Sequence, residues 1–176
     1  MLQDDGWLIL VNNLSSAFCW FLFRSNFSLD ILEKRGVASS SAQKVGLSAV
    51  LAALAIGSGK VLALDLSEEK LAFARELGVH HALNVGDADV QAQISALTGG
   101  GVHIAIETAG SNRALQMAYD ITRRGGTTVT AGMPGPEAEI TLSHLKIAAE
   151  ERSIKGSYMG SCVAKRDIPR YLNMFQ

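Results

Sequence analysis

Cysteine is scarce in this chain, and no excess of one charge is present. The 176 residues include two cysteines, Cys19 and Cys162, which lie far apart with no C-x-x-C pair. We therefore expect neither a disulfide framework nor a structural zinc site, and the cysteine usage is typical of a reducing cytoplasm. The net charge of −1 provides no basic footprint for binding nucleic acid.

A long apolar run is also absent. Residues 7–11 and 17–23 are apolar, but both are shorter than the roughly 20 residues that span a bilayer, and Asn12–Ser16 separates them. Asp4 and Asp5 stand where a signal peptide carries positive charge. These features favour a buried or irregular appendage over targeting or membrane insertion. The remaining composition, 48% hydrophobic and 19% charged, is that of one globular domain.

Strand and helix signals alternate regularly from about residue 40 onward. This alternation predicts an α/β fold with a doubly wound, Rossmann-like parallel sheet, formed as a single domain by residues 37–176 after an irregular N-terminal extension of residues 1–36. We expect strands near 35–40, 60–64, 81–85, 102–107, 126–131 and 153–158. We expect helices at 45–56, from Ser67 to Leu77, at 88–97, from Ser111 to about Arg123 with Arg123 and Arg124 at its negative end, at 142–150 and from Asp167.

The spacing between Gly46 and Asp65 is the most informative pattern. Gly46 begins an apolar helix whose Ala49 and Ala53 share its face, so this helix is expected to lie close to the sheet with its N-terminus near a ligand. Asp65 ends the following strand, where an acidic residue holds the ribose hydroxyls of NAD and disfavours the 2′-phosphate of NADP. The alternative is an aspartate that simply follows a strand.

The glycine turn before this helix departs from the dinucleotide-binding pattern. G-x-G-x-x-G falls on Ser41 to Gly46, and its last glycine alone is present. A side chain at Gln43 would point into space that the phosphates need. Two outcomes therefore stay open: the turn still binds a dinucleotide, or it does not.

Small residues follow three later strands, at 107–110, 131–135 and 156–160. Ligands of open α/β sheets bind at these carboxyl ends, although ordinary turn chemistry gives the same composition. The four histidines show no metal-ligand spacing with cysteines or carboxylates. Ser157 and Tyr158 are no short-chain reductase pair, because Cys162 stands where Tyr-x-x-x-Lys requires lysine.

Several segments together resemble the coenzyme-binding domain of zinc-dependent, medium-chain alcohol dehydrogenases. The resemblance covers roughly residues 45–176, and the matching segments keep the order and spacing that they have in that family. They are Gly46–Val50, Lys60–Leu71, Ala74–Gly78, Ile106–Gly110, Arg124–Gly132 and Ile154–Ser161.

The resemblance implies a six-stranded sheet, NAD as cofactor, and roles by position. Val45 and Gly46 would lie under the pyrophosphate, Asp65 and Lys70 at the adenosine ribose, and Leu66 beside the adenine. The groove and the nicotinamide would be lined by Thr108, Ala109, Ala131, Gly132, Met133, Ser157, Tyr158 and Met159. Members of this family commonly dimerise through their sheets, which would bring residues 137–141 and 153–158 near a homodimer interface.

The zinc-binding catalytic domain of that family has no counterpart in residues 1–36, and the four-cysteine zinc motif is missing. The family would also continue beyond Gln176 with a helix and a return into the catalytic domain. We therefore expect an oxidoreductase that passes hydride between an alcohol and NAD by descent, with little or no activity in this chain alone. The alternatives are a non-catalytic NAD-binding or dimerisation module, an inactive remnant, or a methyltransferase, since an acidic residue after the second strand also suits S-adenosylmethionine.

Overall fold

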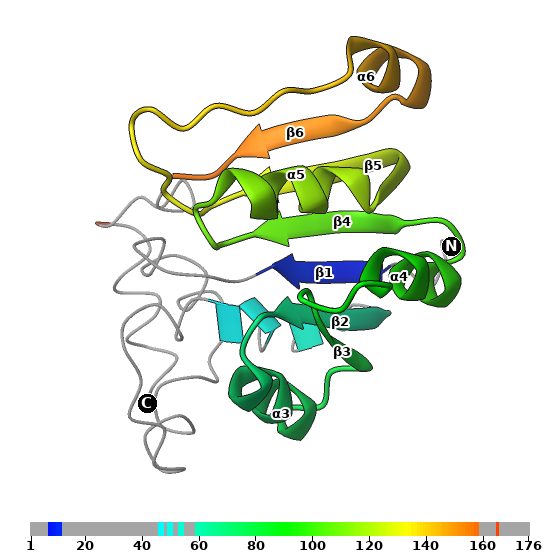
Figure 1. Ribbon diagram of the computed structural model, residues 1–176, viewed down its shortest axis with the longest axis vertical. Helices are drawn as coiled ribbons and strands as arrows, with labels where there is room; N and C mark the ends of the chain where they lie inside the picture. Colours follow the sequence, from blue (N-terminus) through cyan, green and yellow to red (C-terminus); the bar gives the residue numbers. More distant parts are fainter. Residues whose placement is uncertain are drawn as a thin grey trace.

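The computed structural model describes residues 7–11, 46–47, 49–50, 53–54, 59–158 and 165. A six-stranded sheet runs through them in the order β3-β2-β1-β4-β5-β6, and every neighbouring pair is parallel (Figure 1). This is the doubly wound order of dinucleotide-binding folds, so the predicted fold class is confirmed. The strands are β1 (Trp7–Val11), β2 (Lys60–Asp65), β3 (His81–Asn84), β4 (Val102–Glu107), β5 (Thr122–Thr130) and β6 (Ser153–Gly156).

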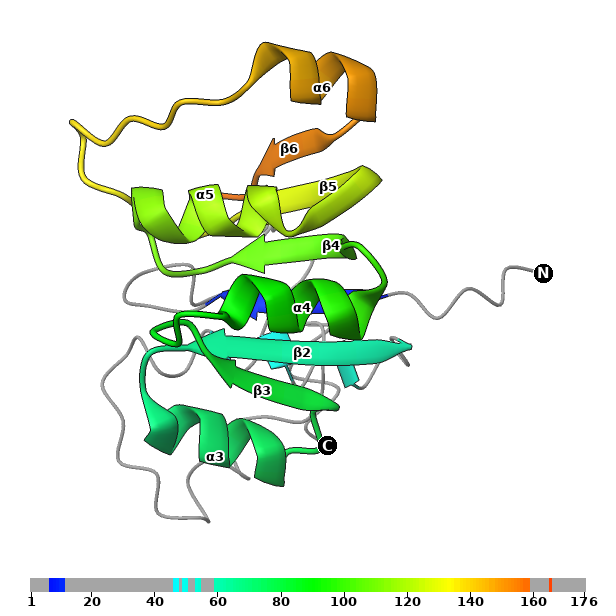
Figure 2. The same ribbon diagram turned by 45° about the vertical axis from the view of Figure 1, so that its right-hand side comes forward.

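Helices cover both faces of the sheet. Residues 46–47, 49–50 and 53–54 are helical and pack with Val61 and Ala63 on one face, together with α3. Leu62 and Leu64 face the other way, into a core shared with α4 and α5, and Figure 2 shows these two helices in front of the sheet. The helices with full bounds are α3 (Glu68–Glu76), α4 (Val90–Thr98), α5 (Asn112–Asp120) and α6 (His144–Glu150).

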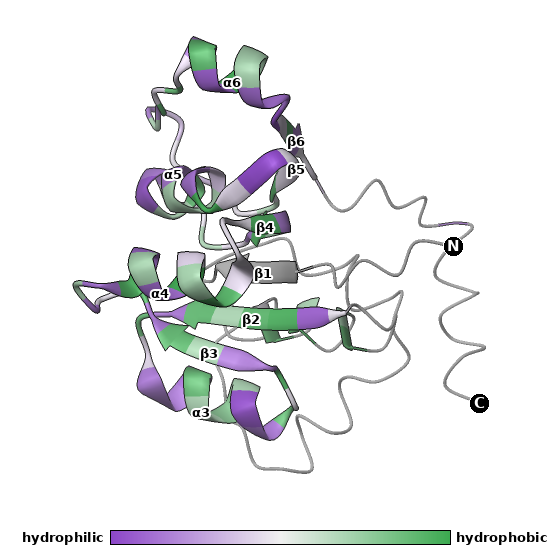
Figure 3. Cartoon of the chain, turned by 90° about the vertical axis from the view of Figure 1, so that its right-hand side faces the viewer, coloured by the Kyte–Doolittle hydropathy of each residue, from purple (hydrophilic) through white to green (hydrophobic). Residues whose placement is uncertain are grey.

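The sequence of β2 shows why it forms a strand that is covered on both sides. Its four central residues are apolar and buried, which is typical of parallel strands with helices on each face. Polar residues stand at its two ends, Lys60 and Asp65, and the hydropathy colouring of Figure 3 changes accordingly along the strand. The apolar run fixes the strand and leaves the carboxylate at its carboxyl end.

The prediction of a first strand near residues 35–40 is wrong, because Trp7–Val11 forms β1 in the centre of the sheet. Val11 pairs with Leu64 of β2 and with Glu107 of β4. The continuous apolar run of residues 7–11 suits a central strand, whereas the segment 35–40 has a single β-branched residue. Five residues that we assigned to an extension therefore belong to the sheet, and residues 12–45 lie outside the described residues.

The predicted boundary between α5 and β5 is also wrong. The helix ends at Asp120, and Arg123 and Arg124 lie in β5 instead of at the helix end. Thr122 explains the early turn, because its buried hydroxyl donates to Ala118 O at 2.7 Å and shares a 2.9 Å hydrogen bond with Thr128. The ladder between β4 and β5 then shifts register between Val102 and Ile104, as at a β-bulge.

The other predicted elements from residue 60 to residue 156 are confirmed to within a few residues. Ser111 caps α5 by accepting from Ala114 N at 3.2 Å, as expected. Ser67 stands at the N-cap of α3, but its side chain makes no capping hydrogen bond. The helix expected from Asp167 lies outside the described residues. Within the described part, the structure contains no helix long and apolar enough to cross a membrane.

Candidate functional site

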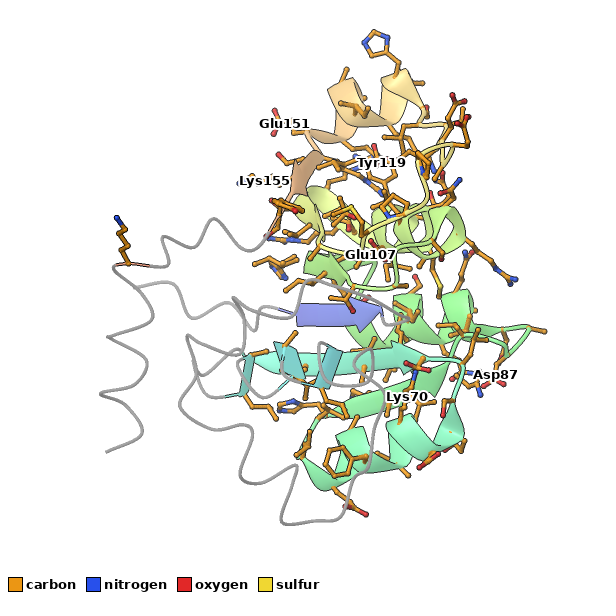
Figure 4. All side chains as sticks on the ribbon, turned by 90° about the vertical axis from the view of Figure 1, so that its left-hand side faces the viewer. Lys70, Asp87, Glu107, Tyr119, Glu151 and Lys155 are labelled. Carbon is orange, nitrogen blue, oxygen red and sulfur yellow. The ribbon has the colours of Figure 1, made fainter. Side chains whose placement is uncertain are left out.

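The carboxyl ends of β1, β2 and β4 meet where the strand order reverses. Open α/β sheets bind ligands in the crevice at this point. Asp65 ends β2, Val11 ends β1 and Glu107 ends β4. Figure 4 labels Lys70 and Glu107 on opposite sides of β1 at this edge, Lys70 toward β2 and Glu107 toward β4. Two carboxylates therefore flank the switch point of the sheet.

Asp65 has a half-satisfied carboxylate. The residue is 6% exposed, and its Oδ1 accepts a hydrogen bond from Ser67 N at 2.8 Å. Its Oδ2 lies 3.5 Å from Lys70 Nζ but is buried without a hydrogen-bond partner in the described part of the chain. Buried carboxylate oxygens normally accept hydrogen bonds, so Oδ2 is suited to a hydroxyl donor from a ligand.

The helical residues 46–47 and 49–50 approach this carboxylate. Gly46, Leu47 and Val50 line a small cavity together with Asp65 and Lys70. Gly46, Leu47, Ala49, Val50 and Ala53 are all buried, as the small-residue face of this helix requires. The predicted pyrophosphate residue Val45 and the turn residues Ser41–Lys44 lie outside the described residues.

A larger cavity of about 500 Å³ opens beside the end of β2, between α4 and α5. Leu66, directly after β2, and Ala109, in the turn after β4, line this cavity, and Leu66 is 63% exposed. Apolar walls with a few polar groups at this volume are typical of small-molecule sites. Its lining residues are Leu66, Val85, Gly86, Asp87, Ala88, Val90, Gln91, Ala109, Ser111, Arg113, Ala114, Gln116, Met117 and Asp120.

The turns after β4 and β5 lie against each other. Gly110 has φ of +66°, and a Cβ there would lie 2.6 Å from Met133 O. A Cβ on Gly132 would overlap Gly110 N and lie 2.8 Å from Glu107 Oε1. Both glycines are therefore required by the close approach of the two turns. Thr108 and Ala109 are buried at this contact, whereas Met133 is 47% exposed.

The end of β6 comes next to the end of β5. Ser157 N donates to Thr130 O at 2.8 Å and is half-buried, while Tyr158 is 71% exposed. Met159 lies outside the described residues.

The structure thus divides the predicted site residues into groups. Asp65, Leu66 and Lys70 lie near the end of β2 and in the first turns of α3, and Ala109 lines the larger cavity together with Leu66. Ala131, Gly132 and Met133 form a second group against Glu107 and Gly110.

Sequence analysis did not single out the Glu107 side chain. Glu107 is 1% exposed, with Oε1 accepting from Gly110 N at 2.6 Å and Oε2 from Thr130 Oγ1 at 2.7 Å. The available signal was a charged residue at the end of an apolar strand, three positions before a glycine.

Metal-binding side chains do not gather in the described part of the chain. Among those residues, no group of three or more histidines, cysteines, aspartates and glutamates could hold a metal ion.

A family model described as zinc-binding dehydrogenase matches residues 45–176. The chain is 33% identical to geraniol dehydrogenase of Castellaniella defragrans over 147 residues, which cover 83% of this chain and 39% of that protein. It is 39% identical to sorbitol dehydrogenase of Bacillus subtilis over 115 residues, 65% of this chain and 32% of that protein. The chain thus spans between about a third and two fifths of these relatives.

Solved structures show the same fold. Benzyl alcohol dehydrogenase from Acinetobacter calcoaceticus superposes with a TM-score of 0.73 at 24% identity, covering 97% of this chain and 39% of that chain. The family model covers three quarters of the sequence, and the solved structure shares the fold of the described sheet. The chain belongs to the zinc-binding dehydrogenase family, the zinc-dependent medium-chain alcohol dehydrogenases, and corresponds to the Rossmann region that binds their cofactor.

Proposed function

We propose that this chain is the NAD-binding part of an oxidoreductase that passes hydride between an alcohol and NAD. The observation that carries the proposal is Asp65 at the end of β2, the ribose position of a doubly wound sheet: within the described part of the chain its buried Oδ2 is 3.5 Å from Lys70 Nζ and accepts no hydrogen bond. We also propose a cytoplasmic location, because two cysteines far apart in the sequence are typical of a protein in a reducing compartment.

Asp65 would accept hydrogen bonds from the adenosine ribose hydroxyls. Its carboxylate already uses Oδ1 for Ser67 N, which fixes the orientation of the group and leaves Oδ2 for the ligand. A 2′-phosphate in the same place would stand against this negative charge, so the site favours NAD over NADP. Lys70, 3.5 Å from Oδ2, holds the carboxylate from the helix side.

The adenine would lie in the cavity between Leu66 and Ala109. Two apolar side chains, from the turns that follow β2 and β4 on either side of β1, suit a flat ring, and the volume of about 500 Å³ is sufficient for it. By family resemblance the nicotinamide would lie along the backbone of Ala131–Met133 and of Ser157 and Tyr158. When bound, NAD supplies the hydride acceptor, and these residues orient its ring.

Zinc does not fit the residues described here. No group of three suitable ligands is present among them. We therefore propose no metal ligand, and no proton or hydride transfer at a metal, among the described residues. Activation of the alcohol would need groups from outside the described residues. Little or no turnover by the chain alone therefore stays a prediction, which an assay of the purified chain with an alcohol, NAD and added zinc would test.

Removal of the Asp65 carboxylate tests the proposed cofactor. We expect Asp65→Ala to weaken NAD binding by about 30-fold, because a hydrogen bond to a charged group contributes about 2 kcal/mol. The same change relieves repulsion of the 2′-phosphate, so the preference for NAD over NADP should fall. Calorimetric titration of the purified chain with each nucleotide measures both effects.

Glu69→Ala is the matched control for Asp65→Ala. It removes one exposed carboxylate from the same neighbourhood, on α3, and should leave NAD binding unchanged. Equal losses in the two variants, or undiminished NAD binding in Asp65→Ala, would contradict the proposed role. Competition by S-adenosylmethionine with greater affinity than NAD would instead favour a methyltransferase.

A dimerisation role has separate support at the edge of the sheet. β6 is the last strand in the described sheet, and its residues are exposed or half-buried. Arg152 fixes the approach to this strand by donating to Tyr119 O at 2.5 Å, with its guanidinium over the Tyr119 ring. An exposed strand edge pairs readily with another strand, so we propose a homodimer formed by two copies of β6.

A proline at the edge of β6 tests the homodimer. Ser157 N points toward β5 and backbone groups alternate in direction, so Gly156 N points to the free edge. Gly156→Pro should therefore convert a dimer to a monomer in sedimentation velocity without disturbing the β5–β6 ladder. Gly156→Ala, whose Cβ meets nothing within 4 Å, should remain dimeric. A wild-type chain that sediments as a monomer would contradict the proposal.

A further inference from the structure

Glu107 has a buried carboxylate whose two oxygens serve two different turns. Oε1 accepts from Gly110 N in the turn after β4, and Oε2 accepts from Thr130 Oγ1 at the end of β5. The side chain is 1% exposed, and none of the ion pairs among the described residues includes it. Burying a charge is costly, so its two hydrogen bonds are what maintain it there.

The backbone of the same residue reinforces this connection. Glu107 O accepts from Ala131 N at 2.8 Å and from Gly132 N at 3.2 Å. One residue therefore makes four hydrogen bonds, one within the turn after β4 and three to the end of β5 and the turn that follows it. An apolar residue at position 107 would keep the backbone bonds but would leave Gly110 N and the Thr130 hydroxyl without acceptors.

The two turns that Glu107 joins lie too close together for a side chain at their contact. Gly110 and Gly132 are in direct backbone contact, where an added Cβ on either would overlap the other turn. Next to this contact, Glu107 and Thr130 line a cavity of about 90 Å³ beneath the segment that follows β5.

We propose that Glu107 is a positioning residue that sets the distance between the turn after β4 and the turn after β5, and thereby places the nicotinamide end of the cofactor. It does not touch the cofactor: its carboxylate is consumed by Gly110 N and Thr130 Oγ1. The proposal rests on the proposed NAD binding for its effect on affinity. Its structural part, the coupling of the two turns, holds for the chain without any nucleotide.

Amide hydrogen exchange on the chain without nucleotide tests the coupling. Glu107→Ala should raise the exchange rates of the Gly110, Ala131 and Gly132 amides about tenfold or more. Gly110 N loses its hydrogen bond to the carboxylate, and Ala131 and Gly132 follow Thr130, whose hydroxyl loses its bond. Glu107→Gln keeps the shape and an acceptor for Gly110 N, and the Thr130 hydroxyl can reverse, so exchange should stay near that of the wild type. Unchanged exchange in Glu107→Ala, or an equal rise across the whole sheet, would overturn the proposal.

Two threonines of β5 provide matched variants that keep the test decisive if Glu107→Ala fails to fold. Thr130→Val removes one of the two side-chain bonds and should loosen the same amides. Thr128→Val removes a buried hydroxyl two residues away that bonds to Thr122 and not to Glu107, so those amides should remain protected. Equal loosening in both variants would assign the effect to general destabilisation and reject a specific role.

Calorimetry with NAD and with ADP-ribose separates this inference from the proposed function. Glu107→Ala should weaken NAD about tenfold more than ADP-ribose, which lacks the nicotinamide ring, and Glu107→Gln should restore NAD binding. Equal losses for both probes, or none, would overturn the positioning role while leaving NAD binding intact. A wild-type chain that binds neither probe would reject the proposed function, and the exchange measurements would still decide whether Glu107 couples the turns.

Discussion

Joining β1 directly to a glycine turn is expected to strengthen NAD binding about 100-fold. In the sequence, residues 12–45 separate Val11 at the end of β1 from Gly46 at the start of the helix, a connection of 34 residues. Dinucleotide-binding folds instead follow the first strand at once with G-x-G-x-x-G, whose backbone N–H groups contact the pyrophosphate. Here the first two glycine positions hold Ser41 and Gln43.

The variant deletes residues 12–40 and carries Ser41→Gly and Gln43→Gly, so that Val11 precedes Gly-Ala-Gly-Lys-Val-Gly46. Two restored hydrogen bonds to the charged pyrophosphate would contribute about 3 kcal/mol in total, which corresponds to about 100-fold in affinity. The shorter connection should also raise the unfolding free energy by about 1.5 kcal/mol, since loop-closure entropy grows with length. Calorimetric titration and thermal unfolding measure the two effects.

Two partial variants are the controls for this change. Ser41→Gly with Gln43→Gly but no deletion should gain little, because the glycines stay far from the end of β1 in sequence. The deletion alone should recover stability without most of the gain in affinity, because Gln43 still stands where the phosphates would lie. A shortened, glycine-containing chain that folds but binds NAD no better than the original would show that the pyrophosphate does not lie at this turn.

The first strand shows where sequence reasoning failed. Its five apolar residues are plain in the sequence, but 34 residues separate them from Gly46, and connections between elements in compact domains are usually short. The strand near 35–40 that we expected lies next to the helix at 45–56, whereas β1 does not. Hydrophobic pattern identified β2 and β4 because each is a compact apolar run with a polar end. The error arose from distance along the chain and not from the composition of the strand.

In the candidate site too, features that depend on nearby residues could be predicted from the sequence, whereas contacts between residues far apart in the chain could not. Asp65 could be placed at the candidate site from sequence because it ends a strand, and strand ends meet at one edge of a parallel sheet. The Glu107 side chain could not be assigned, because its partner Thr130 lies 23 residues later and on a neighbouring strand. Arg123 and Arg124 were misplaced because the buried contact between Thr122 and Thr128 outweighs the helix-end preference for basic residues.

The second large effect is expected from a single methyl group at Gly132. Its Cβ would overlap Gly110 N, lie 2.6 Å from Gly110 Cα and lie 2.8 Å from Glu107 Oε1. Two of these three atoms belong to the backbone and cannot rotate away. We expect Gly132→Ala to lower the free energy of unfolding by about 4 kcal/mol, beyond the usual cost of an extra methyl group in a packed interior. Urea denaturation followed by circular dichroism measures the loss.

Gly135→Ala separates this steric effect from the general cost of replacing a glycine in the segment after β5. Gly135 lies three residues further along, and a Cβ there meets nothing within 4 Å. The unfolding free energy of the Gly135→Ala variant should therefore change by less than about 0.5 kcal/mol. Because the Gly132 methyl also pushes on the Glu107 carboxylate, any Gly132→Ala chain that remains folded should bind NAD more weakly than Gly135→Ala. Comparable stability and NAD affinity in the two variants would mean that the turns after β4 and β5 can separate freely, and the role assigned to Glu107 would fail with them.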